Sequence, residues 1–279
     1  MTAYNRERYI AEAIESVLYS SYQNWELIVV DDCSSDRTVA IAKSYEQKDS
    51  RIKVYINEKN LGDYPNRNKV ASYATGYYLK YLDSDDILHR DALEKMTDYM
   101  QQYPEAAWGI SNFLPGLDDK QFPVCLSNKE AYEFHYFKHP IFFASPGLTI
   151  ISKKAFDSVG GFGDKRMVSD FEMWHKLSNY SAVVLMPGKA ILMRNHANQE
   201  KKDQQKYVVD YERVKLAYLY SKRCPLSVQQ IRKIKRQRKR TLLKIAAKKL
   251  MKLDIKEAKP RFKVFWFYMR HGSKGSSQY

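Results

Sequence analysis

Two apolar, β-rich runs that each end in a cluster of carboxylates constrain this fold more than any other feature of the sequence. The run at 25–30 ends in two aspartates at 31–32, and the run at 77–82 ends in Asp-Ser-Asp-Asp at 83–86. Apolar residues recur at helical spacing around these runs, as at 6–20. Strands that alternate with helices are typical of an α/β domain, so we expect a mainly parallel central sheet flanked by helices.

The two carboxylate clusters are predicted to lie at the ligand-binding edge of that sheet. In open parallel α/β sheets, ligands bind beyond the carboxyl ends of the strands. Clustered carboxylates repel one another, and a divalent cation with a phosphorylated ligand would neutralise them; hard oxygen ligands suit Mg²⁺ or Mn²⁺. Aspartate is also common at helix caps and in turns, which would account for either cluster alone. Two clusters at successive strand ends favour the binding site.

Four segments resemble the family 2 glycosyltransferases of the GT-A fold in order and spacing. They are Thr2-Ala3-Tyr4-Asn5-Arg6, Trp25 to Asp36, Asn60-Leu61-Gly62 with Arg67-Asn68, and Tyr81 to Asp86. Three later segments agree with the resemblance: Lys153 to Phe162, Ser169 to Trp174, and Arg194-Asn195-His196. The resemblance implies a GT-A-like nucleotide-diphospho-sugar transferase fold, which we expect to form a catalytic domain over residues 1–221.

The same resemblance implies an activity. We expect an inverting, metal-dependent glycosyltransferase that moves a sugar from a nucleotide-diphosphate donor to a hydroxyl of a glycan or lipid-linked acceptor, in cell-surface polysaccharide synthesis. UDP-sugar is the donor that the family suggests, with Mn²⁺ or Mg²⁺ as cofactor.

Individual residues take their expected roles from their place in the family's motifs. Nucleotide binding falls on Thr2, Tyr4, Asp32, Arg67 and Asp83. Metal or diphosphate contact falls on Asp85, Asp83 and His196, whereas Asp86 belongs either to this shell or to the start of the next helix. The general base falls on Asp170, for which the alternative is an N-cap of the helix near 168–178.

These roles are chemically consistent with sugar transfer. A bound cation stabilises the negative charge that develops on a nucleotide-diphosphate leaving group without needing a proton. The acceptor hydroxyl is a poor nucleophile until a positioned carboxylate such as Asp170 takes its proton. A base on the sugar face opposite the leaving group gives a single displacement with inversion.

The sequence departs from the family at two places. Ser169 stands where the family has a glutamate before the catalytic aspartate, which affects a supporting contact rather than the base. Family members also have a central apolar strand just before the segment that begins here at Thr2. Because this chain begins at Met1, we expect that strand to be missing, through truncation or a misassigned start rather than through loss of activity.

The positive charge is concentrated in the C-terminal part. Residues 222–279 hold 19 Lys/Arg against two acidic residues, a net charge of +17, whereas the remainder holds 28 against 30. Apolar residues at near-helical spacing predict a basic amphipathic helical tail over 222–279. Such helices with aromatic residues bind anionic membranes. A solvated helix packed on the body is the other interpretation.

Two rival functions use the same features. Basic runs with aromatic residues also bind nucleic acid, so the alternative is a nucleic-acid- or membrane-binding protein with a catalytically inactive glycosyltransferase-like body. The near-neutral body makes nucleic acid the less favoured partner. A nucleotidyltransferase would be expected to carry a glycine-rich phosphate loop, and only Gly62 lies near the right place.

Cysteine content and hydropathy bear on location. The three cysteines lack metal-type spacing, which favours a reducing compartment. The longest apolar run, 264–269, is far shorter than the roughly 20 residues of a spanning helix. We therefore expect a cytoplasmic protein, peripheral on the inner face of the cell membrane.

Overall fold

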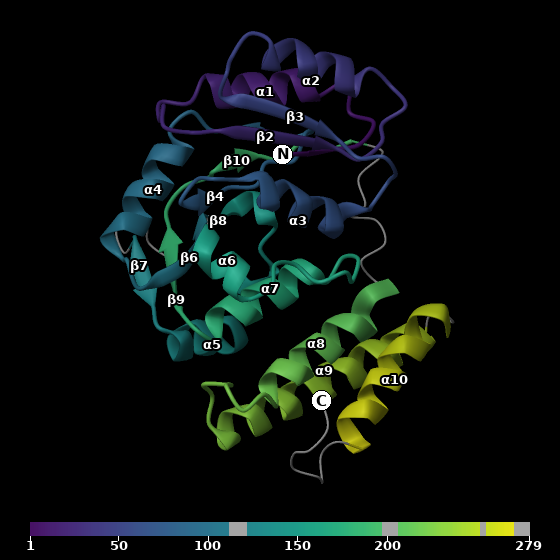
Figure 1. Ribbon diagram of the computed structural model, residues 1–279. Coiled ribbons are helices and arrows are strands. Elements are labelled where there is room, and N and C mark those ends of the chain that lie inside the picture. The colour runs from purple at the N-terminus through teal and green to yellow at the C-terminus, as the bar shows by residue number, and fades with distance from the viewer. Residues whose placement is uncertain (112–121, 197–205, 252–254, 271–279) are drawn as a thin grey trace. The chain divides into compact units, whose positions relative to one another are not determined.

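The computed structural model describes residues 1–111, 122–196, 206–251 and 255–270, and the chain divides into two compact units (Figure 1). The α/β unit comprises Met1–Ala131 and Ile141–His196. The helical unit comprises Tyr132–Pro140 and Ala197–Tyr279.

The α/β unit begins with a three-stranded parallel sheet in the order β1-β2-β3. Its strands and the three helices beside them are β1 (Thr2–Ala3), β2 (Leu27–Asp31), β3 (Ile52–Ile56), α1 (Ile10–Leu18), α2 (Thr38–Glu46) and α3 (Asp63–Tyr73). Helices α1 and α2 cover one face, and α3 covers the other (Figure 1). Alternate residues of β2 serve the two faces, since Val29 joins the core that includes α1, whereas Ile28 and Val30 pack against Val70 of α3.

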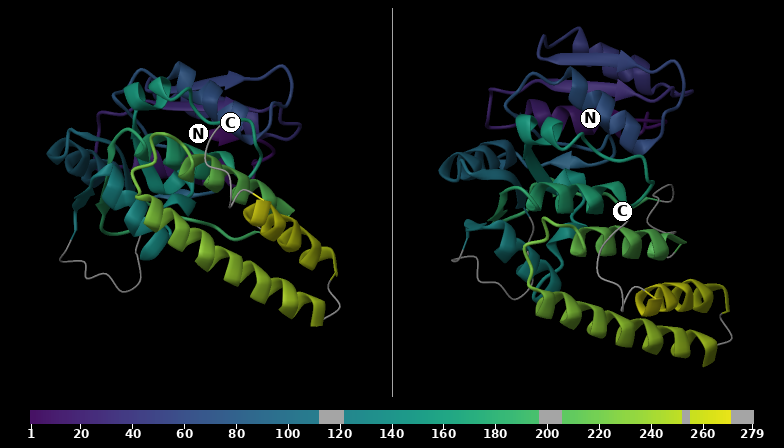
Figure 2. Two further views of the ribbon diagram at one scale, coloured as in Figure 1. Left: turned by 90° about the horizontal axis from the view of Figure 1, so that it is seen from below. Right: turned by 60° about the horizontal axis from the view of Figure 1, so that its bottom comes forward.

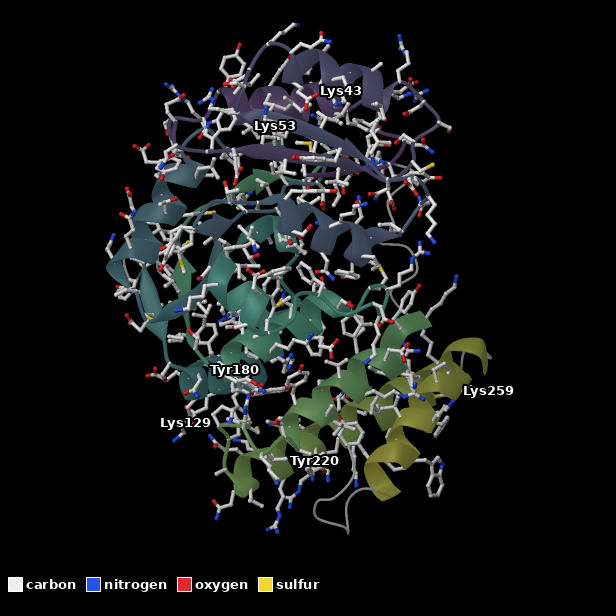
Figure 3. The ribbon with its side chains drawn as sticks, viewed as in Figure 1. Lys43, Lys53, Lys129, Tyr180, Tyr220 and Lys259 are labelled. Atoms are coloured by element: carbon white, nitrogen blue, oxygen red, sulfur yellow. The ribbon has the colours of Figure 1, made fainter. Side chains whose placement is uncertain are left out.

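Strand β3 shows how the outer edge of this sheet meets water. Ile52 and Val54 are buried, whereas Lys53 between them is exposed. Lys53 and Lys43 of α2 are labelled at this end of the unit in Figure 3. The period of two is that of a strand with one buried face, as expected from the sequence.

A second sheet of five strands follows in the order β4-β8-β6-β9-β7, with a two-stranded sheet formed by β5 and β10. These strands are β4 (Tyr78–Leu79), β5 (Ile87–Leu88), β6 (Ala106–Ser111), β7 (Val124–Leu126), β8 (Thr149–Ser152), β9 (Ala182–Met186) and β10 (Ile191–Leu192). In the five-stranded sheet only β6 and β9 pair in parallel. The α/β class is as expected and the first sheet is parallel, but the five-stranded sheet is mixed and β5 pairs with β10 antiparallel, because the apolar pattern of a buried strand does not specify the direction of its neighbours.

The chain has further helical elements outside the tail, of which α7 lies where the sequence predicts a helix near 168–178. They are α4 (Ala92–Gln102), α5 (Asn128–Phe137), η2 (Ile141–Phe143), η3 (Pro146–Leu148), α6 (Lys153–Ser158) and α7 (Ser169–Ser178). Helix α7 carries Trp174, which is fully buried and stacks on Trp108 of β6 with ring centroids 4.8 Å apart. This packing holds α7 against the five-stranded sheet.

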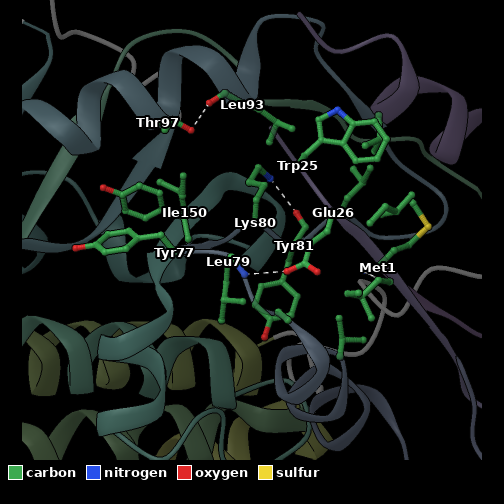
Figure 4. A pocket seen from close by; sticks show the side chains of 18 of the residues that line it. Met1, Trp25, Glu26, Tyr77, Leu79, Lys80, Tyr81, Leu93, Thr97 and Ile150 are labelled. Atoms are coloured by element: carbon green, nitrogen blue, oxygen red, sulfur yellow. Dashed lines mark hydrogen bonds between the residues drawn. The ribbon is translucent and has the colours of Figure 1, made fainter. Parts of the chain in front are cut away.

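A cavity separates the two larger sheets. Strand β1 has only two residues and pairs with Val30 and Asp31, at the carboxyl end of β2. Beyond it, a cavity of about 370 Å³ lies between β2 and β4, with Met1, Trp25 and Lys80 among its lining residues (Figure 4). The Met1 amino group donates to the Ile28 carbonyl at 2.7 Å inside this space. Where the sequence analysis expected a missing central strand, the structure therefore has a two-residue strand and a cavity.

The helical unit contains α8 (Val208–Leu219), α9 (Val228–Met251) and α10 (Ile255–Arg270). Figure 2 shows α9 and α10 side by side. The three helices share an apolar core of Leu216, Leu242, Val264 and Tyr268. Helix α8, which the sequence analysis placed in the 1–221 domain, groups with the tail helices through these contacts. Residues 252–254 and 271–279 of the predicted tail lie outside the described residues.

A buried carboxylate joins the three helices electrostatically. Glu212 of α8 accepts from the Tyr268 hydroxyl at 2.6 Å and pairs with Lys215 at 2.9 Å and Arg238 at 2.5 Å. These cations hold the pKa of Glu212 below its usual range although burial acts in the opposite direction.

Among the described residues, no helix is long and apolar enough to cross a membrane.

Candidate active site

The acidic loop that follows β4 brings three carboxylates together. Asp83, Asp85 and Asp86 each place one oxygen within 4.8 Å of the others. Thr2 forms an isolated parallel bridge with Asp83, so the end of β1 lies directly beside this loop. Asp86 is buried, and its Oδ1 accepts the backbone N–H of Arg194 at 3.1 Å. The loop is thus fixed at the carboxyl edge of the first sheet, where the sequence predicts it.

Basic side chains surround this loop. Arg67 of α3 is 7% exposed and lies between two carboxylates, with Nε 2.8 Å from Asp63 and Nη2 2.8 Å from Asp83. Arg6 Nε and His196 Nε2 both contact Oδ2 of Asp85, at 3.1 Å and 2.8 Å. The structure therefore assembles Arg67, Asp83, Asp85 and His196, which the sequence analysis selected from distant segments.

The donor set fits a hard divalent cation. Carboxylate oxygens that converge on one point suit Mg²⁺ and Mn²⁺, and Mn²⁺ also accepts imidazole. Both donors on Asp85 reach Oδ2, so Oδ1 has no partner among the described residues. Because Nε2 of His196 is engaged with Asp85, this histidine is arranged to orient a metal ligand rather than to bind the metal through that nitrogen.

An unsatisfied guanidinium nitrogen lies next to the acidic loop. Nη1 of Arg67 is buried and makes no hydrogen bond within the described part of the chain. A buried donor without a partner is costly, and a ligand oxygen would remove that cost. This atom is therefore available to a phosphate or to a polar edge of a nucleotide.

The aspartates at the end of β2 are engaged in turns. The Asp32 carboxylate accepts from the backbone N–H groups of Leu61 and Gly62, at 2.8 and 2.9 Å, and from Nδ2 of Asn57 at 2.8 Å. These bonds fix the start of α3, where Gly62 has a φ of 85° that favours glycine. The turn-forming role that the sequence allowed for this cluster is thus present, and nucleotide binding by Asp32 stays a prediction.

The segment after β1 forms an exposed rim beside the acidic loop. Tyr4 is 47% exposed. Asn5 adopts a φ of 52°, its N–H donates to the Ser34 hydroxyl at 2.8 Å, and its side chain accepts the N–H of Ser35 at 2.9 Å. This links the rim to the turn after β2. Tyr4 and Thr2 therefore lie at the edge where the sequence analysis expects a nucleotide.

Asp170 lies within the first turn of α7. The N-cap of this helix is Val168, so Asp170 is a helical residue and not the N-cap that the sequence left open. Its Oδ1 accepts the N–H of Phe171 at 2.7 Å. Burial raises the pKa of Asp170 to about 6, against the effects of the Phe171 N–H, Tyr64 and Arg67. A carboxylate with that pKa is ionised at neutral pH and is basic enough to take a proton.

Sequence reasoning assigned no role to two residues of this site, Arg6 and Tyr64. Arg6 was present in the motif that begins at Thr2, and its contact with Asp85 spans 79 positions of sequence. Tyr64 precedes Arg67 by three residues, which on a helix places both side chains on one face. That spacing is the only signal for Tyr64 in the sequence.

The fold and this edge define an α/β protein of the GT-A type, with an acidic loop suited to a cation. The chain belongs to Glycosyl transferase family 2, whose family model matches residues 1–160. The predicted family and fold are thereby confirmed.

One curated relative is the E. coli protein named UDP-Glc:alpha-D-GlcNAc-diphosphoundecaprenol beta-1,3-glucosyltransferase WfgD. It is 45% identical over 100 residues, which cover 36% of this chain and 39% of the relative. The matched segment spans about two fifths of the length of several such curated relatives.

Two solved structures share the fold. S. aureus TarS 1-349 in complex with UDP-GlcNAc matches with a TM-score of 0.65 and 20% identity over 84% of this chain and 68% of TarS. The mannosyltransferase PcManGT from Pyrobaculum calidifontis, in complex with GDP-Man and Mn²⁺, matches with a TM-score of 0.61 and 14% identity over 94% of this chain and 83% of that one.

Proposed function

We propose that this chain is an inverting glycosyltransferase that transfers a sugar from a UDP-sugar to a hydroxyl of a glycan or lipid-linked acceptor, in cell-surface polysaccharide synthesis. The observation that carries the proposal is the convergence of Asp83, Asp85 and Asp86 beside the unsatisfied Nη1 of Arg67. Together they offer a cation site next to a buried donor for an anionic ligand. The names and ligands of WfgD and TarS support a UDP-sugar donor, and WfgD supports a lipid-linked acceptor.

The residues around the acidic loop would bind the donor. Asp83 and Asp85 would hold Mn²⁺ or Mg²⁺, with His196 orienting Asp85. When bound, the cation would stabilise the charge on the departing diphosphate. Arg67 would donate to the nucleotide through Nη1. Mn²⁺ in the PcManGT structure supports the choice of metal.

The exposed rim and the turn after β2 would complete the nucleotide site. Thr2 and Tyr4 would contact the base and ribose from the edge beside the acidic loop. Asp32 would support nucleotide binding by fixing the turn at Leu61 and Gly62, or its carboxylate would accept a hydrogen bond from the nucleotide directly. These assignments rest on the family's motif positions and on the placement of the three residues at one edge.

Asp170 would act as the general base. At neutral pH its carboxylate is charged, because burial raises its pKa only to about 6. It would accept the proton of the acceptor hydroxyl as that oxygen attacks the anomeric carbon. Turnover should therefore fall as the pH drops below about 6, where Asp170 becomes protonated.

The helical unit would bind an anionic membrane surface at the cytoplasmic face. Helix α9 contains ten Lys/Arg and no acidic residue. Five of these side chains are exposed at intervals of four residues and form the basic stripe: Arg232, Arg236, Arg240, Lys244 and Lys248. Each basic residue near an anionic bilayer contributes about 1 kcal/mol. Nucleic acid is the competing partner.

A panel of nucleotide-sugars tests the catalytic proposal. The full chain is incubated with each sugar donor and a hydroxyl acceptor, with and without Mn²⁺, and the anomeric configuration of the product is read by NMR. We expect metal-dependent turnover of a UDP-sugar with inversion. Asp91→Asn, which alters an exposed acid paired with Lys95 outside the site, is the control. Retention of configuration, or no turnover of any donor, would contradict the proposal.

A further inference from the structure

The segment of residues 194–196 lies against the acidic loop. It follows β10, which pairs antiparallel with β5, the strand that directly follows Asp86. The backbone N–H of Arg194 donates to Asp86 at 3.1 Å, and Nε2 of His196 lies 2.8 Å from Oδ2 of Asp85. Two neighbouring carboxylates of the loop are therefore joined to this segment.

Tyr9 contacts two side chains of the 194–196 segment. It is the N-cap residue of α1 and is half-buried. Its ring stacks on the imidazole of His196, with centroids 4.9 Å apart and 23° between the ring planes. The guanidinium of Arg194 lies 5.4 Å from the centroid of the same ring. One ring therefore contacts both the residue that bonds Asp85 and the residue that bonds Asp86.

Two ion pairs flank Tyr9 at intervals of three residues. Arg6 lies 3.1 Å from Asp85, and Glu12 lies 2.8 Å from Arg194. The Glu12 side chain is 63% exposed, so water and salt weaken its pair. Arg6 acts on the loop itself, and its carbonyl accepts the backbone N–H of Tyr9 at 2.9 Å. The turn that starts α1 thus fixes the backbone from which Tyr9 contacts the 194–196 segment.

The stacked ring supplies a constraint on His196 that its hydrogen bond does not. Rotation about χ2 of a histidine is broad, so one contact at Nε2 leaves the plane of the imidazole poorly defined. Aromatic rings that stack have a preferred separation and a preferred angle. The ring of Tyr9 therefore limits the orientations in which His196 can contact Asp85.

We propose that Tyr9 is a positioning residue whose ring keeps the imidazole of His196 against Asp85 and thereby raises the affinity of the acidic loop for a divalent cation. The inference rests on the cation site of the proposed function. Groups that orient a metal ligand typically change metal affinity about 10–100-fold. Tyr9 acts on such a group and touches neither the cation nor the reacting atoms in this assignment.

Mn²⁺ binding to the full chain tests this inference. The affinity is measured in the presence of UDP from the electron paramagnetic resonance signal of free Mn²⁺, so the readout does not depend on sugar transfer. Tyr9→Leu keeps an apolar side chain and removes the ring, and we expect the affinity to fall about three- to tenfold. Tyr9→Met should give the same loss. Tyr9→Phe retains the stacked ring and should bind Mn²⁺ as the parent chain does.

Tyr55→Leu is the matched control. Tyr55 of β3 is 36% exposed, and its ring stacks on Tyr73 with centroids 3.9 Å apart. This variant loses a stacked tyrosine of the same unit that contacts neither His196 nor Arg194 in the described part of the chain. We expect its Mn²⁺ affinity to equal that of the parent.

A double-mutant cycle shows whether Tyr9 acts through His196. In a His196→Ala background, which already lacks the imidazole, adding Tyr9→Leu should cause no further loss of Mn²⁺ affinity. An equal loss in both backgrounds would show that Tyr9 does not position His196.

Asp85→Asn separates a failure of this inference from a failure of the proposed function. If the parent binds no Mn²⁺, or if Asp85→Asn binds it as tightly as the parent, the cation site itself is wrong and the inference falls with it. If Asp85→Asn abolishes binding but folded Tyr9→Leu or Tyr9→Met binds as the parent does, Tyr9 is not a positioning residue. Thermal unfolding of each variant is the last check, since an affinity loss that only follows unfolding would assign Tyr9 a structural role and overturn the inference.

Discussion

The candidate active site and the basic stripe of α9 use charge in opposite ways. In the α/β unit, the charged side chains of the candidate site are shielded and paired across long sequence distances, as Arg67 with Asp83 and Arg6 with Asp85. In the helical unit, the basic stripe is exposed, and α9 carries no acidic residue that would balance it. The interaction energy of a shielded ion pair depends on its geometry. The attraction exerted by exposed charges depends on their number and is screened by salt.

Substitutions should therefore depend on position in the candidate site and be interchangeable in the basic stripe. Loss of one partner from a buried pair leaves the other uncompensated, so single changes in the α/β unit should have large effects that depend on position. Changes in the basic stripe should be nearly interchangeable and roughly additive.

Asp170→Asn should cause the largest fall in turnover of any of these substitutions. We expect turnover to fall about 10²–10⁴-fold, because the amide cannot accept the acceptor's proton, while UDP affinity measured by calorimetry with Mn²⁺ is retained. The pKa of Asp170 is raised on folding to about 6, so ionisation of this group destabilises the folded chain at pH values above its unfolded pKa. The variant should therefore unfold at an equal or higher temperature at pH 7. Turnover like that of the parent would refute the assignment.

Asp85→Asn should abolish the response to metal while the fold persists. Loss of a cation's charge stabilisation, worth several kcal/mol, corresponds to at least about a 100-fold loss of turnover. The Asn side-chain oxygen can still accept from Arg6 Nε and His196 Nε2, and the charge is lost from a cluster of like charges, so the unfolding temperature should change little. The checks are a Mn²⁺ titration of turnover in parent and variant, and chelation by EDTA. Asp91→Asn should respond to Mn²⁺ as the parent does, and an unchanged titration in Asp85→Asn would exclude Asp85 as a ligand.

Neutralisation of the basic stripe tests whether exposed charges are interchangeable and additive. Arg236, Arg240 and Lys244 are replaced by Gln, and we expect binding to anionic phospholipid vesicles to weaken about 100-fold, from roughly 1 kcal/mol per residue. The three possible double variants should weaken vesicle binding by nearly the same factor as one another. Added salt should weaken the binding of the parent chain in the same way. Turnover of a soluble acceptor should not change. Retention on DNA or RNA with no vesicle binding would support the nucleic-acid interpretation.

The smallest effect is expected at the cavity between β2 and β4. Five apolar, β-branched residues added before Met1 would continue β1 along β2 and fill part of the roughly 370 Å³. Cavity filling is typically worth about 0.5–2 kcal/mol, a rise of a few degrees in the unfolding temperature. The control is an extension of five Ser and Asn residues. Equal unfolding temperatures for both extensions would show that the cavity does not accept a strand.

Much of the candidate site could be predicted because its signals are local. Asp83 and Asp85 follow an apolar run, and a loop after a strand at the carboxyl edge of a sheet is a ligand-binding position whatever the rest of the chain does. The parallel direction of β1, β2 and β3 also followed from the helices between them. The antiparallel insertion of β8 between β4 and β6 did not, since no local pattern records which strands become neighbours.

The α/β class, most of the helices and strands, the acidic loop and the basic tail could be predicted because periodicity and charge are properties of short segments. The contacts of Arg6 with Asp85, of Arg67 with Asp83 and of α8 with α10, by contrast, become visible only in the folded chain. Those contacts join residues that are far apart in the chain. Their geometry depends on how packed helices and sheets fix the distances between side chains, which no short segment of sequence encodes.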